Sequence, residues 1–239
     1  MCHFFETKLK KTFRFLKFFT KLLLGREVFY FRQKKIPTEL IGTKEYGSWL
    51  IHPKNVTKDS IVYSFGIGQD ISFDTDLIKK FDCKVFAFDP TPKSISWLKK
   101  QTLPKNLRYF EIGLDAKDDI IEMFPPQNPH HVSYSIVSKN SNAIPVQIKV
   151  AQLKTIMQDL GHLKIDILKM DIEGSEYRAI DNILKSNINI DQILVEFHHR
   201  FPKISPRETK KTIEQLNNAD YKIFAISSSR EEYSFVKSK

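Results

Sequence analysis

Apolar and polar positions follow two different rhythms along this chain, and the alternation between them predicts strands and helices in turn. Short apolar runs are typical of strands covered on both faces, and they occur at residues 60–65, 83–89, 107–114, 146–150, 164–170 and 191–201. Apolar residues at every third or fourth position predict helices at about 73–81, 94–98, 153–160, 176–184 and 206–218. Two closing strands, 221–226 and 233–236, are expected to form a hairpin at a sheet edge. The pattern therefore predicts an α/β fold with a doubly wound, mainly parallel sheet.

The stretch from Lys164 to Tyr177 combines a buried strand, two acids and the start of a helix. Asp171 and Glu173 stand where the strand ends, and sheets of this kind bind ligands outside the carboxyl ends of their strands. A helix N-terminus favours acids through its dipole, which accounts for Glu173 better than for Asp171. Acids on a tight turn are costly unless a cation or a hydrogen-bond donor uses them. We therefore favour a functional role for this pair.

A Gly-x-Gly sequence, Gly66 to Gly68, follows the first strand of the main domain. Glycines at a strand-to-helix turn let a ligand approach the backbone closely. The third glycine of a dinucleotide fingerprint is missing, and Gln69 and Asp70 follow instead. Because Asp70 would repel a pyrophosphate, the turn favours a cationic or zwitterionic ligand.

Asp89 ends the next strand, 21 positions after Gly68. An acid at this place in nucleoside-binding folds accepts hydrogen bonds from a ribose diol. The other interpretation is a turn acid or helix cap before Pro90 and Pro92. We favour the ribose interpretation.

The positive charge is concentrated at the N-terminal end. The net charge is +10, and residues 1–35 contain ten basic and two acidic side chains. The rest of the chain is therefore nearly neutral, which argues against a nucleic-acid-binding face on it. Residues 4–24 alternate lysines and arginines with phenylalanines and leucines at helical spacing. This helix either lies on an anionic membrane surface or covers the domain, and it is too interrupted by lysines for a signal peptide or a membrane span.

These features divide the chain into an arm, residues 1–35, and one domain, residues 36–239, a length that suits a single α/β core. Residues 120–150 are expected to form an insertion or lid over the ligand crevice. His130 and His131 within it lack a metal-ligand spacing. Two distant cysteines, Cys2 and Cys83, indicate neither a disulfide framework nor a zinc site, so we expect a reducing, cytoplasmic setting, with peripheral contact at the inner membrane face through residues 1–35.

Taken together, four motifs in this order resemble the FkbM family of S-adenosylmethionine-dependent methyltransferases over about residues 45–235. They are Tyr63-Ser64-Phe65-Gly66-Ile67-Gly68, Phe88-Asp89-Pro90-Thr91-Pro92, Met170-Asp171-Ile172-Glu173-Gly174-Ser175-Glu176 and Glu196-Phe197-His198. The resemblance implies a Rossmann-like class I methyltransferase sheet of seven strands, the last antiparallel, and methyl transfer to a hydroxyl oxygen. The acceptor would be a small molecule or a glycan, such as a saccharide or a lipid-linked glycan.

The resemblance also implies where the S-adenosylmethionine would lie. The turn from Gly66 to Gly68 would support it, Asp89 would face its ribose, and Gly113 and Leu114 would lie near its adenine. Many methyltransferases have an acid two residues before the first glycine, and this chain has Ser64 there. Gln69 or Asp70 would then take over the hold on the amino-acid end of the donor.

Methyl transfer to an alcohol requires alignment of the reacting atoms and removal of a proton. His198 is the first candidate for the base, Asp171 the second, and Glu173 lies on the same strand end. A divalent metal such as magnesium, held by Asp171, Glu173 and Glu196, is a further but less favoured interpretation. His198 would alternatively be a structural histidine bonded to Glu173.

Two other classes of function compete with this assignment. A non-catalytic domain would keep the nucleoside pocket without a working base, and substitutions of His198 and Asp171 would then leave its biological role unchanged. A nicotinamide-dependent oxidoreductase is disfavoured by the missing third glycine and by Asp70 at the phosphate position.

Overall fold

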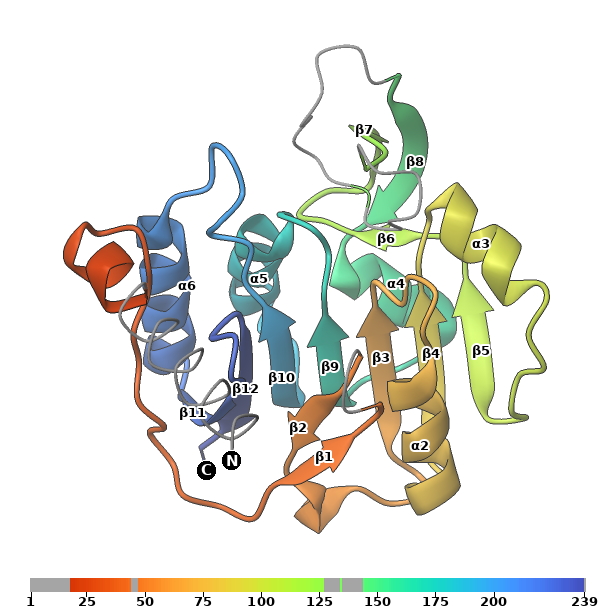
Figure 1. The fold of residues 1–239 in the computed structure, drawn as a ribbon. Coiled ribbons are helices and arrows are strands. Elements are labelled where there is room, and N and C mark those ends of the chain that lie inside the picture. Colours follow the sequence, from red (N-terminus) through yellow and green to blue (C-terminus); the bar gives the residue numbers. More distant parts are fainter. Residues whose placement is uncertain (1–17, 44–46, 127–133, 135–143, 239) are drawn as a thin grey trace, which may run out of the picture.

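The computed structural model describes residues 18–43, 47–126, 134 and 144–238. Its main sheet has seven strands in the order β11-β12-β10-β9-β3-β4-β5 (Figure 1). The last strand, β12, runs antiparallel to both of its neighbours, and all other neighbours pair in parallel. The predicted doubly wound α/β fold with a seven-stranded sheet and an antiparallel last strand is confirmed. The closing hairpin also forms, with β12 inserted between β10 and the edge strand β11.

The elements of the main domain follow the predicted alternation closely. The strands of the sheet are β3 (Ile61–Phe65), β4 (Lys84–Phe88), β5 (Leu107–Phe110), β9 (Ile165–Met170), β10 (Ile190–Glu196), β11 (Tyr221–Ile226) and β12 (Glu232–Lys237). The helices are α2 (Ser72–Phe81), α3 (Pro92–Leu98), α4 (Leu153–Leu160), α5 (Glu176–Lys185) and α6 (Pro206–Asn218). A short strand pair, β1 (Glu39–Ile41) and β2 (Trp49–Ile51), precedes the sheet, with a 3-10 turn at Pro53–Asn55.

Both faces of the sheet are covered, which is why its strands are apolar throughout. Helices α4, α5 and α6 pack on one face in a core that includes Leu168 of β9. Helix α2 and the β1–β2 pair pack on the other, around Ile167 of the same strand. Helix α3 joins this second face through Leu98. Successive residues of β9 thus point to opposite cores, as the pleat of a strand requires.

The register of the central strands brings their carboxyl ends to one level. Phe65 of β3 pairs with Phe88 of β4 and with Met170 of β9, and Met170 in turn pairs with Val195 of β10. The residues that follow these positions are therefore neighbours along one edge. They are Gly66, Asp89, Asp171 and Glu196, so four of the chemically informative residues of the sequence are collected by strand pairing alone.

A second, three-stranded sheet lies beyond this edge (Figure 1). It consists of β6 (Gly113–Leu114), β8 (Val146–Ala151) and β7 (Asp119–Met123) in the order β6-β8-β7. The prediction of a single strand at 107–114 is therefore wrong. The chain leaves the main sheet after Phe110, and Gly113 and Leu114 pair with β8. Strand β7 was also missed, since its outer residues are exposed and Ile120 is 64 % exposed. Residues 127–133 and 135–143 of the expected insertion, which include His130 and His131, lie outside the described residues.

The described part of the N-terminal arm is attached to the domain. Residues 18–23 are helical, and residues 1–17 lie outside the described part. Glu27 and Val28 are buried, and the backbone N–H groups of Gln33 and Lys34 both donate to the carbonyl of Ile223 on the edge strand β11. Covering an edge strand in this way removes open hydrogen-bonding groups. Among the described residues, no helix has the length and apolar character needed to cross a bilayer.

Candidate active site

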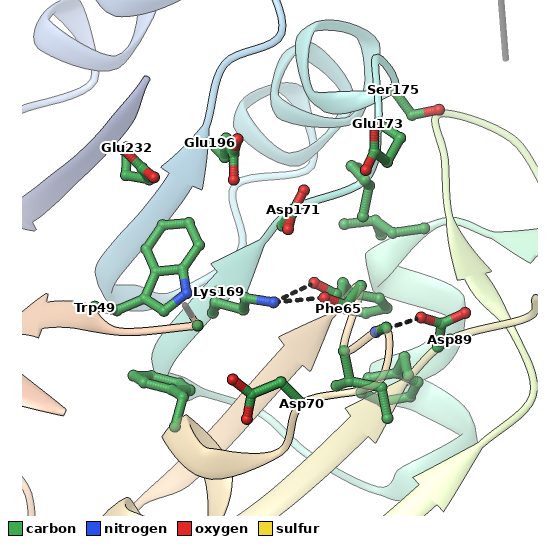
Figure 2. Close-up of a pocket in the computed structure, with 18 of the residues that line it drawn as sticks. Trp49, Phe65, Asp70, Asp89, Lys169, Asp171, Glu173, Ser175, Glu196 and Glu232 are labelled. Carbon is green, nitrogen blue, oxygen red and sulfur yellow. Dashed lines mark hydrogen bonds between the residues drawn. The ribbon is translucent and has the colours of Figure 1, made fainter. Parts of the chain in front are cut away.

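A cavity of about 720 Å³ opens at the carboxyl edge of the main sheet (Figure 2). Its volume lies within the range of about 300–1,000 Å³ that is usual for ligand sites. Its lining comes from the ends of β3, β4, β9 and β10, from β2, from the small sheet and from the β11–β12 turn. Among the lining residues are Trp49, Gly66, Gly68, Asp70, Asp89, Gly113, Leu114, Lys169, Asp171, Glu173, Glu196, Ser227, Ser228, Ser229 and Glu232.

Gly66 holds two strand ends together. Its φ is +74°, and a Cβ at this position would lie 1.6 Å from the carbonyl oxygen of Asp171. The backbone N–H of Gly66 donates to Phe88, and that of Asp171 donates to Phe65. The expected reason for this glycine was the close approach of a ligand. The structure shows a different one, because the turn after β9 occupies the space of a side chain.

The carboxylate of Asp89 accepts hydrogen bonds from the β3–α2 turn and from its own β4–α3 turn. Its Oδ2 accepts from the N–H of Gly68 at 2.9 Å, and its Oδ1 accepts from the N–H and the hydroxyl of Thr91 at 2.9 and 2.6 Å. The side chain is buried, yet it lines the cavity beside Gly68. The acid therefore already has the structural role of a turn acid, and contact with a ribose remains a prediction.

Lys169 is a site residue that the sequence analysis did not identify. Its ammonium donates to the carbonyls of Phe65 at 3.2 Å and Gly66 at 2.6 Å, and it lies 5.5 Å from the centre of the Trp49 ring (Figure 2). It is only 6 % exposed. A lysine between the apolar residues Leu168 and Met170 of a central strand is rarely buried without a partner, and that signal was present in the sequence.

The turn after Asp171 is organised by Glu176. Glu173 has a left-handed backbone with φ of +53°, a strained conformation for a residue with a side chain. The carboxylate of Glu176 accepts from the N–H groups of Ile172 and Gly174. The same carboxylate accepts from Nδ1 of His198 at 2.7 Å. Glu176 is completely buried, and it thus fixes the turn and the histidine in one arrangement.

His198 lies against several acids, behind the cavity wall. Its Nε2 is 3.6 Å from Oδ1 of Asp171, 3.5 Å from Oε2 of Glu173 and 3.9 Å from Oε1 of Glu196. Burial disfavours the imidazolium, but the carboxylates of Glu176, Asp171 and Glu173 outweigh it and hold the pKa of His198 well above its usual value. His198 is not among the described residues that line the cavity. Its assignment as the base therefore stays a prediction. Its hydrogen-bond partner is Glu176, whereas the alternative of a structural histidine named Glu173.

The acids of the cavity outnumber its buried cations. Burial raises the pKa of Asp171, against the influence of Lys169 and His198. Burial and the neighbouring Asp171 raise the pKa of Glu196 to about 9. Glu196 also lies directly opposite Glu232 in the β10–β12 pairing, where like charges destabilise a sheet. Such an arrangement favours a ligand that carries positive charge or donates hydrogen bonds.

The remaining candidates divide between the cavity and its surroundings. Asp70 lines the cavity, and its carboxylate accepts from the N–H of Ser72 and the hydroxyl of Thr43. Gly113 and Leu114 line it on the side of the small sheet. Ser64 is fully buried below the turn, and Gln69 is exposed; within the described residues neither belongs to the cavity lining. Asp70 therefore lies at the cavity and Ser64 and Gln69 lie outside its lining, and the roles of all three in binding a ligand stay predictions.

Comparisons with known proteins show which proteins this chain is similar to. The probable methyltransferase-like protein 24 of Homo sapiens is 25 % identical over 177 residues, which cover 70 % of this chain and 42 % of that protein. The protein of the same name from Rattus norvegicus is 25 % identical over 178 residues, covering 70 % of this chain and 43 % of its own. The chain thus matches less than half the length of these relatives. A solved structure, the fibrillarin pre-rRNA processing protein of Methanococcus jannaschii, superposes with a TM-score of 0.46 at 12 % identity, over 87 % of this chain and 86 % of that one.

The profile of the methyltransferase FkbM domain matches residues 54–223. This range contains all the strands that form the carboxyl edge of the cavity, together with Asp89, Asp171, Glu196 and His198. The match confirms the predicted methyltransferase domain, with S-adenosylmethionine as the donor that defines such domains, and covers well over half of the chain. The chain belongs to the FkbM methyltransferase family.

Proposed function

We propose that this protein transfers a methyl group from S-adenosylmethionine to a hydroxyl oxygen of a glycan or another polyhydroxylated small molecule. The observation that carries the proposal is a single cavity with a nucleoside-type turn at one end and a cluster of carboxylates at the other. Family membership supports the reaction type, and the lining of the cavity supports the kind of acceptor.

The donor half of the cavity suits the parts of S-adenosylmethionine. Gly68 and Asp89 offer a turn and a carboxylate for the ribose diol, and Leu114 with Gly113 offers an apolar wall for the adenine. The cavity is acidic next to this half, at Asp171. Since the donor carries a sulfonium and an ammonium group, an acidic surrounding favours its binding over that of a pyrophosphate. This also disfavours the nicotinamide alternative.

The acceptor half is rich in hydrogen-bond acceptors and hydroxyls. Glu173, Glu196 and Glu232 line it, together with the three serines of the β11–β12 turn, Ser227 to Ser229. Glu232 contacts the hydroxyls of Ser227 and Ser229. Carboxylates accept hydrogen bonds from hydroxyl groups, and Trp49 adds an aromatic surface (Figure 2). A polyol satisfies such a wall better than an apolar or a phosphorylated acceptor does.

The reaction needs little from the protein apart from alignment and a proton acceptor. When bound, S-adenosylmethionine would supply an activated methyl group, and its transfer to the acceptor oxygen would release S-adenosylhomocysteine as the leaving group. The carboxyl groups of Asp171, Glu173 and Glu196 surround the region that the acceptor would occupy. Because the pKa of Glu196 is raised to about 9, Glu196 is protonated at neutral pH and would position the hydroxyl, and the hydroxyl proton would pass to Asp171 or Glu173. A positioned base of this kind contributes about 10²- to 10⁴-fold in rate.

The test is transfer of a radiolabelled methyl group from S-adenosylmethionine to separate pools of oligosaccharides, glycolipids, peptides and RNA. We expect label in the saccharide-containing pools, stable to mild base as an ether is. The Glu196→Gln variant should lose most of this transfer while it still binds the donor. Label in RNA or in peptides alone would contradict the proposed acceptor class.

A further inference from the structure

We propose that Asp171, Glu196 and His198 form a binding site for a divalent cation beside the acceptor half of the cavity. One ligand atom from each side chain can be chosen so that all of them lie within 4.8 Å of one another. The distances from His198 Nε2 to Asp171 Oδ1 and Glu196 Oε1 are 3.6 and 3.9 Å. Ligands around one ion at about 2.0–2.2 Å lie at about such separations from one another.

The histidine is held as metal-binding histidines usually are. Its Nδ1 donates to the buried carboxylate of Glu176, which leaves Nε2 facing the two acids. A carboxylate behind the other ring nitrogen is the common support of a histidine ligand, because it fixes the tautomer and the ring orientation. Glu176 is fixed in turn by two backbone N–H groups.

A second observation points into the same place. Oδ1 of Asp171 is a buried atom, although 27 % of the whole side chain is exposed, and it has no hydrogen-bond partner within the described part of the chain. A buried carboxylate oxygen without a donor is costly. A cation at Nε2 and Oδ1 would satisfy it, and would also relieve the repulsion between Glu196 and Glu232.

The donor set selects the class of ion. One imidazole and two carboxylates form a mixed nitrogen and oxygen set without thiolates, which suits Mn²⁺ or a related first-row divalent ion better than Cu⁺ or an iron–sulfur cluster. Glu173, whose Oε2 lies 3.5 Å from the same Nε2, is in reach as a further oxygen ligand. The bound cation would then balance the negative charge of these acids, which Lys169 alone does not balance.

The role of the ion rests on the proposed function. Asp171 and Glu196 line the cavity, so a cation bound by them contacts both the protein and the acceptor. A divalent ion binds hydroxyl oxygens and lowers the pKa of the alcohol that it binds. It would thus orient one hydroxyl of a polyol and favour loss of its proton.

The site can be tested with Mn²⁺ alone, after treatment of the full-length protein with a chelator. Loss of the free-ion signal in electron paramagnetic resonance measures binding, and electron spin echo modulation reports a bound nitrogen. We expect about one Mn²⁺ per chain, with nitrogen coupling. Glu196→Gln and His198→Gln should each weaken binding at least about tenfold, and His198→Gln should remove the nitrogen coupling.

The matched control is Asp70→Asn, which changes an acid of the same cavity that contacts Ser72 and Thr43. It should keep Mn²⁺ affinity within about twofold, a change of less than about 0.5 kcal/mol. Circular dichroism identifies any variant that fails to fold. Of the two ligand variants, Glu196→Gln should fold more readily, because Glu196 lies on the cavity wall. The site would be overturned if the wild type bound no Mn²⁺, or if Glu196→Gln and His198→Gln both bound it as the wild type does. His198 would then be a protonated histidine that pairs with the surrounding acids.

Failure of this site and failure of the proposed function are separable. Methyl transfer that proceeds unchanged in excess chelator would contradict the role of the ion and leave the methyltransferase assignment standing. Mn²⁺ binding by a protein that does not bind S-adenosylmethionine would contradict the proposed function and leave the cation site standing.

Discussion

At the scale of single residues, Gly66 lies where the turn after β3 meets the turn after β9. Replacement by alanine would place a methyl group 1.6 Å from the Asp171 carbonyl and would also impose a φ of +74° on a residue with a side chain. We expect Gly66→Ala to lower the free energy of unfolding by more than about 3 kcal/mol, since strain and overlap add. Denaturant unfolding followed by circular dichroism measures it.

Gly161 provides the control for Gly66. Its φ is +71°, but a Cβ there would have no heavy atom within 4 Å among the described neighbours. Gly161→Ala should therefore lower the free energy of unfolding only by the cost of a left-handed backbone, about 1–2 kcal/mol. Equal losses for the two variants would show that contact with the Asp171 turn is not what requires glycine at position 66.

Asp74 gives a prediction about pH. Burial raises its pKa to about 6, against the influence of Lys169, while the unfolded chain has a value near 3.8. The folded state therefore binds the proton more tightly, so the stability that this proton provides is present at low pH and is lost as the pH rises to about 6. We expect Asp74→Asn to raise the free energy of unfolding by up to about 3 kcal/mol at pH 8.

The same substitution should have little effect near pH 4, where the carboxyl of Asp74 is protonated in the folded protein. Thermal unfolding at the two pH values measures the difference. A stability change that is the same at both would mean that the buried carboxyl of Asp74 does not titrate as its surroundings require.

Residues at strand ends could be predicted from the sequence, and residues that depend on tertiary contacts could not. Asp89 and Asp171 follow apolar runs directly, so their place at the cavity edge follows from local pattern alone. Glu176 looks like an ordinary acid in the first turn of a helix, and only its contact with His198 from another strand shows its role. His198 was placed correctly at a strand end, but which carboxylate it contacts depends on side-chain packing.

At the scale of elements, helices and strands were predicted correctly where a buried face makes apolar residues recur at regular positions. The prediction failed where burial does not make them recur in this way. Helix α4, bounded by Leu153 and Leu160, was predicted with these bounds because its apolar face is continuous. Strand β7 was missed because it is the edge strand of the small sheet, paired with β8 alone, and most of its residues are exposed. The break between β5 and β6 has no turn residue at Glu111 or Ile112 to mark it. The small sheet it creates forms one wall of the cavity.

The described helix of the arm and the turn that follows it present apolar side chains to solvent. Phe19, Leu23 and Leu24 are 49 %, 75 % and 62 % exposed, beside basic residues such as Lys21. We propose that this segment contacts an anionic membrane surface, since such helices gain from both apolar burial and charge. Sedimentation with vesicles that contain phosphatidylserine should show binding that the double variant Leu23→Glu, Leu24→Glu loses.

Leu163 is the control for the arm, because it is 93 % exposed and lies in the loop before β9. Leu163→Glu should leave vesicle binding unchanged. Equal binding by the wild type and the arm variant would indicate that these exposed residues belong to a protein contact or to no contact.

At the scale of the whole molecule, the sheet order makes the site. Parallel pairing of β4, β3, β9 and β10 brings a nucleoside-type turn and a carboxylate cluster to the same edge, and the small sheet and the β11–β12 turn close the cavity around them. This arrangement explains why motifs more than a hundred residues apart in the sequence act as one site. Under the proposed function, donor binding would be separable from acceptor chemistry, because different strand ends would carry the two.

Calorimetric titration of S-adenosylmethionine into the full chain tests the central claim most directly. We expect one molecule to bind per chain, and Asp89→Asn to weaken binding at least about tenfold, because an amide nitrogen in place of Oδ2 would face the N–H of Gly68 and could not accept a hydrogen bond from the ribose. This variant keeps an oxygen for Thr91, and its circular dichroism should match that of the wild type. A folded wild-type protein that takes up no S-adenosylmethionine would contradict the methyltransferase assignment of this cavity.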